Sequence, residues 1–110
     1  MKEGSDQSPM ACSLTTAELR DRQAKLLAQF RSAVIETEEI QDGYAFHLAG
    51  EDKWIRLVVE LIVAERACCP FLTFAAAALP HAGPIIFRVT GPAATKEFLR
   101  VLLCKPEEST

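Results

Sequence analysis

Two adjacent cysteines near the middle of the chain are the residues best suited to chemistry. Cys68 and Cys69 lie in the stretch A-E-R-A-C-C-P-F, between a Glu-Arg pair and Pro70. Thiolates bind soft metals such as Hg(II), Cu(I), Cd(II) and Zn(II). Thiols also exchange disulfides, and many buried cysteines act only as small apolar core residues. The pair alone leaves three hypotheses open: a metal site, a redox site and a structural pair.

Glu65 and Arg66 are the charged residues closest to the thiols. In a helix that runs to about Cys68, Glu65 lies three residues before Cys68 and four before Cys69, on the same side as both thiols. Pro70 disfavours a helical Cys69, which leaves the two thiol side chains free to converge or to diverge. A helix C-terminus raises a thiol pKa, and Arg66 is the cation that would oppose this. We expect both residues to stabilise the ligands of a site without binding the metal themselves.

A third thiol stands near the N-terminus. Cys12 comes just before a predicted helix, in a polar segment over residues 1–13 that we expect to be a flexible arm. Two adjacent cysteines chelate a linear ion poorly, and a trigonal set of Cys12, Cys68 and Cys69 suits a soft metal better. His47 and His81 are further nitrogen donors, although no spacing places them at the thiols.

Other catalytic and metal motifs are missing from the sequence. It has no C-x-x-C or H-x-x-x-H pair, which argues against a closed zinc site. It has no Ser-His-Asp order, phosphate loop or dinucleotide fingerprint. Cys104 follows an apolar run and is predicted to be a core or boundary residue. A binding protein is therefore favoured over an enzyme.

The hydrophobic pattern predicts an α+β fold in the order α-β-β-α-β-β-α. We expect helices from a cap at Thr15 or Thr16 to about residue 30, then over 52–68 and 93–103, and strands over 34–41, 44–50, 71–80 and 85–91. Asp42-Gly43 is typical of a hairpin turn. These elements predict a four-stranded, mostly antiparallel sheet with helices on one face. One domain over residues 14–104 would carry the arm and a solvated tail over 105–110.

Composition and charge narrow the class of protein. The 110 residues are 49% hydrophobic and carry a net charge of −3, which argues against non-specific nucleic-acid binding. No apolar run reaches the length of a membrane span, and the N-terminus lacks a signal-peptide core. We expect a cytoplasmic protein whose thiols are reduced. A homodimer through a sheet edge or a helix face is a further expectation.

Four strings carry a resemblance to known proteins: C-S-L-T-T-A-E-L-R-D-R, E-R-A-C-C-P-F-L-T-F, G-P-I-I-F-R-V-T-G and K-E-F-L. Over about residues 10–100 the chain resembles a family of small, largely uncharacterised bacterial proteins with an E-R-x-C-C-P-F motif. That family is related to segments near or fused to mercury-responsive regulators. The resemblance implies a heavy-metal or thiol context, with Cys12, Glu65, Cys68 and Cys69 as the matching positions. The sequence has no helix-turn-helix with a basic recognition helix, so the resemblance does not imply that this chain binds DNA.

Together these observations predict a soft heavy-metal binding protein of the mercury or copper type. Its ligands would be Cys12, Cys68 and Cys69, and its ion would be Hg, Cu or Zn. One alternative is a thiol-disulfide redox protein that cycles between Cys12 and one of the vicinal pair. The other is a non-catalytic interaction module whose cysteines are structural.

Overall fold

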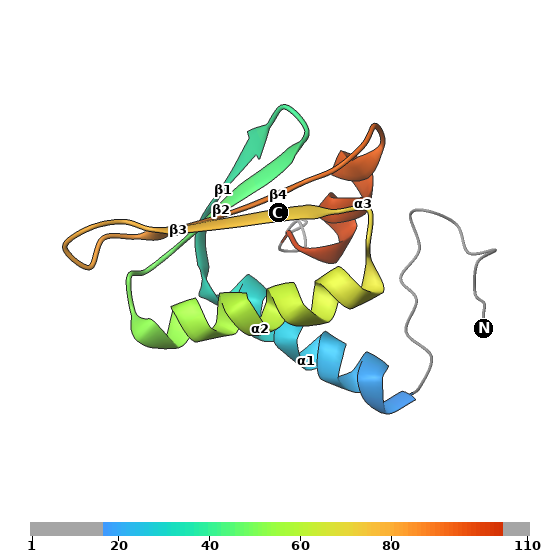
Figure 1. Ribbon diagram of the computed structural model, residues 1–110, viewed down its shortest axis with the longest axis horizontal. Coiled ribbons are helices and arrows are strands. Elements are labelled where there is room, and N and C mark those ends of the chain that lie inside the picture. Colours follow the sequence, from blue (N-terminus) through green and yellow to red (C-terminus); the bar gives the residue numbers. More distant parts are fainter. Residues whose placement is uncertain (1–16, 105–110) are drawn as a thin grey trace, which may run out of the picture.

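The computed structural model describes residues 17–104, which form three helices and one four-stranded antiparallel sheet (Figure 1). The helices are α1 (Ala17–Ala33), α2 (Asp52–Cys68) and α3 (Thr95–Leu102), and the strands are β1 (Val34–Ile40), β2 (Gly43–Leu48), β3 (Thr73–Ala78) and β4 (Ile85–Thr90). The predicted α+β class and element order are confirmed. The predicted helix cap at Thr15 or Thr16 lies outside the described residues. None of the described helices is both long and apolar enough to cross a membrane.

The sheet has the strand order β1-β2-β4-β3, so the two hairpins meet through their second strands. Phe46 on β2 pairs with Phe87 on β4 at the centre of this junction. Side chains alternate between the two faces of a strand, so Phe46 and Phe87 point to the same face. Figure 1 shows α1 and α2 running along one face of the sheet. The helices therefore cover the face of the sheet that carries Phe46 and Phe87.

Three phenylalanine rings join α1 to the centre of the sheet. Phe30 is fully buried and meets Phe46 and Phe87 edge to face, at centroid distances of 5.1 and 5.6 Å. Edge-to-face contacts of this kind add to the free energy of burial. On α1, Leu26, Leu27 and Phe30 recur at helical spacing, which explains why this face of the helix packs on the sheet.

The first hairpin forms where the sequence predicts it, but Gly43 has a different role. The turn residues are Gln41 and Asp42, and Gly43 is already the first residue of β2, paired with Ile40. Its φ is not positive, unlike the glycine of the commonest two-residue turns. A Cβ built on Gly43 would collide with the Val89 carbonyl oxygen of β4. Glycine is needed here because two backbones approach closely.

The two edges of the sheet differ in chemistry. β1 is almost entirely exposed, carries Glu36, Glu38 and Glu39, and has an irregularity in its pairing with β2 between Val34 and Glu36. Bulges and charges of this kind discourage further strand pairing. β3, at the other edge, reads T-F-A-A-A-A and carries no charged side chain.

Candidate metal centre

The end of α2 determines where the two cysteines lie. Pro70 stops the helix, which ends at Cys68. Cys69 leaves the helical conformation with φ −126° and ψ 77°, yet its N–H still donates to the Glu65 carbonyl oxygen at 2.6 Å. The predicted helix end is therefore confirmed. At the other end, α2 begins at Asp52, as predicted, and the preceding residue Glu51 forms no side-chain cap hydrogen bond.

This turn brings three potential ligands together. The side-chain ligand atoms of Glu65, Cys68 and Cys69 all lie within 4.8 Å of one another. The Cys69 sulfur is 3.6 Å from Glu65 Oε1 and 3.7 Å from the Cys68 sulfur. All three residues are buried. We call this group the thiol–carboxylate cluster; its atoms can hold one metal ion.

Gln23 on α1 completes the cluster, and the sequence analysis missed it. Its Nε2 donates to Glu65 Oε2 at 2.6 Å and to the Cys68 sulfur at 3.6 Å. The sequence feature that could have identified Gln23 is its position on the apolar stripe of α1, four residues after Leu19 and three before Leu26. A polar side chain on a buried stripe normally has a polar partner. That partner lies 42 residues away in the chain, so the sequence could not name it.

Burial makes the ionised form of the Glu65 carboxyl unfavourable. The residue is only 1% exposed, and its partners given above are a neutral amide and a thiol. Burial raises the pKa of the Glu65 carboxyl, and the hydrogen bonds from Gln23 and Cys69 oppose this rise in part. A buried carboxylate is stable only when it is paired or binds a metal. Proton binding, or a metal ion that takes the place of the proton, satisfies this requirement.

Arg66, a predicted site residue, and Cys104, predicted to be a core or boundary residue, both lie outside the cluster. Arg66 is exposed on α2 and lines a hollow with Ile62, Val63 and Ala67. Cys104 is half-buried beyond the end of α3, and burial raises the pKa of its thiol. Cys12 lies outside the described residues, and its place in the ligand set stays a prediction.

The two histidines lie on other surfaces. His47 stands on the sheet face opposite Phe46, where its Nε2 is 3.4 Å from Glu38 Oε1. His81 is exposed in the turn between β3 and β4, with a φ of 61°. Neither belongs to the thiol–carboxylate cluster.

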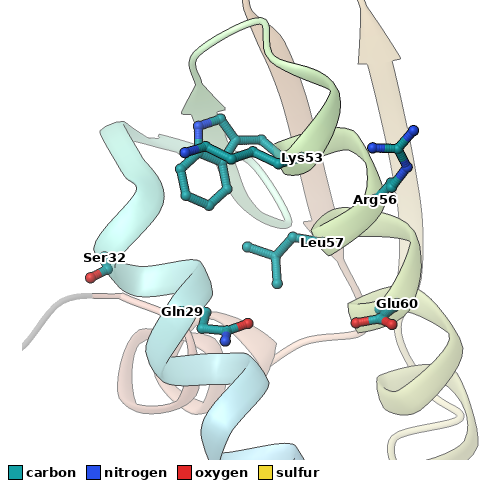
Figure 2. Close-up of a pocket in the computed structure, with 7 residues that line it drawn as sticks. Gln29, Ser32, Lys53, Arg56, Leu57 and Glu60 are labelled. Carbon is teal, nitrogen blue, oxygen red and sulfur yellow. The ribbon is translucent and has the colours of Figure 1, made fainter.

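Two grooves run between α1 and α2. The larger, about 510 Å³, is lined by Gln29 and Ser32 from α1 and by Lys53, Trp54, Arg56, Leu57 and Glu60 from α2. Figure 2 shows Leu57 reaching between the helices, with Gln29 on the α1 side. The Lys53 ammonium lies 4.7 Å from the Trp54 ring, a cation–π contact that gives this groove a polar rim.

The smaller groove lies beside the cluster. It encloses about 280 Å³ and is lined by Leu19, Arg22, Gln23, Val59, Glu60, Val63, Ala64 and Ala67. We call it the apolar groove. Because Gln23 belongs both to this groove and to the cluster, the two sites share a wall.

The chain matches no protein-family model, no curated protein and no solved structure. The site itself therefore carries the functional argument.

Proposed function

We propose that this protein binds a soft heavy-metal ion of the mercury or copper type at the thiol–carboxylate cluster. The observation that carries the proposal is the convergence of Glu65, Cys68 and Cys69, which are buried and whose ligand atoms lie within 4.8 Å of one another. Two thiolates select a soft cation over Mg²⁺ or Ca²⁺. The resemblance carried by E-R-A-C-C-P-F supports the same class of ion.

The spacing of the sulfurs indicates the coordination number. Two sulfurs 3.7 Å apart, each about 2.3 Å from one ion, subtend an angle near 107° at the ion. Linear two-thiolate binding needs about 4.6 Å between the sulfurs. The pair as it stands suits a bent site with three or four ligands. We assign Glu65 as one of these ligands, through a carboxylate oxygen, instead of a supporting role alone.

Cys12 is the proposed third thiolate. Ala17, the first residue of α1, comes five positions after Cys12, and an extended chain over five positions spans up to about 17 Å. Gln23, which touches the cluster, lies six residues into α1, or about 9 Å along the helix axis. The chain before α1 is therefore long enough to turn back and bring Cys12 to the cluster.

Native mass spectrometry of the reduced protein tests this function. Sub-stoichiometric Hg(II), Cu(I) or Zn(II) is added, and the retained ion is counted for the wild type, for the Cys68→Ser/Cys69→Ser variant and for Cys12→Ser. We expect one tightly held Hg(II) or Cu(I) ion in the wild type, none in the double variant and weaker retention without Cys12. Cys104→Ser is the matched control and should retain the ion.

Equal retention in the wild type and the double variant would overturn the proposal, as would no retained ion. A disulfide between Cys12 and one of the pair, seen as the loss of two hydrogen masses after mild oxidation without any retained ion, would favour the redox alternative.

A further inference from the structure

We propose that the metal reaches this protein as a cation bearing one apolar organic group, with the metal at the cluster and the organic group in the apolar groove. This inference rests on the proposed function and names its substrate class. The groove lies directly against the cluster, and its shape and lining have no role in binding a bare ion.

Gln23 connects the groove to the thiols. Ala64 and Ala67 line the groove, and each stands one residue before a member of the cluster. Gln23 also lines the groove, and its Nε2 contacts Glu65 Oε2 and the Cys68 sulfur. Rotation of the half-buried Gln23 side chain opens the buried thiols toward the groove. A metal bound to Cys68 would then hold its remaining substituent in the groove.

The lining of the groove selects an apolar, uncharged group. Val59 and Val63 are 52% and 67% exposed, and Leu19 is 45% exposed, although all three are large apolar residues. Such side chains grouped on one surface indicate a binding site. Arg22 and Glu60, the charged residues of the lining, are opposite in sign and give the groove no net charge. An anionic occupant therefore gains nothing here, whereas an alkyl or aryl group leaves water.

Capture requires only ligand exchange. In R–Hg–X the bond from mercury to X breaks, where X is chloride or a small thiolate, and a bond from mercury to the Cys68 sulfur forms. The Cys68 proton leaves with X as HX, and neither metal nor sulfur changes oxidation state. The mercury–carbon bond stays intact, and Cys69 and Glu65 supply further donor atoms.

Competition between phenylmercury and inorganic Hg(II) tests the inference. The full reduced chain is equilibrated with each probe against excess free cysteine, and bound mercury is measured for the wild type, Val63→Glu and Val101→Glu. Val63 and Val101 are similarly exposed helix valines, at 67% and 74%, and only Val63 lines the groove. We expect Val63→Glu to lower phenylmercury binding about tenfold or more relative to Hg(II), since this is the scale of burying part of an aromatic ring. Val101→Glu should leave the ratio unchanged.

The outcomes separate this inference from the proposed function. If Hg(II) is held at the thiols but Val63→Glu leaves the phenylmercury ratio unchanged, the inference is overturned and the metal site stands. If neither probe is held by the wild type, both are overturned. If Val63→Glu changes only the sedimentation of the protein, the groove binds a second copy of the chain, and the inference is again overturned.

Discussion

The side-chain amide of Gln23 on α1 donates to Glu65 Oε2 on α2 over 2.6 Å and also reaches the Cys68 sulfur. This one side chain stabilises the carboxylate, contacts a thiol and lines the surface groove. Its position connects the stability of the helix pair to the accessibility of the thiols.

Removing that amide should expose the thiols. In Gln23→Ala we expect Cys68 and Cys69 to react with a small aromatic disulfide about tenfold faster than in the wild type, because the side chain between them and the groove is gone. The control is Gln29→Ala, on the same helix but in the lining of the larger groove. Equal rates in wild type and Gln23→Ala would show that Gln23 does not restrict access to the thiols.

The buried carboxyl should make the metal-free protein less stable as the pH rises. Burial raises the folded-state pKa of Glu65 above the ordinary value of 4.5, so the folded protein keeps a proton that the unfolded chain loses. The contribution of Glu65 to stability is fully present below 4.5 and is lost as the pH rises through the folded pKa. A pKa that differs by one between the folded and the unfolded chain changes the free energy of unfolding by about 1.4 kcal/mol.

Urea unfolding between about pH 4 and pH 8 measures this loss. The Glu65→Gln variant has no proton to lose at this position, so its stability should fall less over the same range than that of the wild type. Glu60→Gln, an exposed carboxylate on the same helix, is the control and should follow the wild type. Parallel curves for wild type and Glu65→Gln would contradict a raised pKa.

The aromatic contact between α1 and the sheet should dominate global stability. Phe30→Ala should lower the free energy of unfolding by about 3–5 kcal/mol, because it leaves a cavity between the Phe46 and Phe87 rings. Phe30→Leu should cost markedly less, since it fills part of that space. Chemical denaturation of the two variants gives both values, and similar losses for both would mean that ring contacts, not volume, hold α1 on the sheet.

Patterns of neighbouring residues predicted the helices and strands. The features that they did not predict depend on contacts between residues far apart in the sequence. Pro70 fixes the end of α2, and the alternation of Tyr44, Phe46 and Leu48 fixes the buried face of β2, each from a few neighbouring residues. The meeting of β2 with β4 depends on how two separate hairpins pack, and no short pattern in the sequence encodes it.

The same distinction holds at the site. Glu65 and Cys68 lie one helical turn apart and Cys69 follows directly, so the grouping of these three residues was predictable from their spacing. Gln23 is brought to them by the packing of α1 on α2, which the sequence did not reveal. Arg66, although adjacent to Glu65, faces outward because successive helical residues differ by about 100° in direction. Cys12 stays a prediction.

The contrast between the two sheet edges limits how copies of this protein can assemble. An incoming strand meets uncharged alanines along β3, but three glutamates and an irregular ladder along β1. Two chains joined through β3 would present a β1 edge at each end of a continuous eight-stranded sheet. Like charges at both ends would then repel any further chain, so growth by strand addition would stop at a closed pair of chains instead of a fibre.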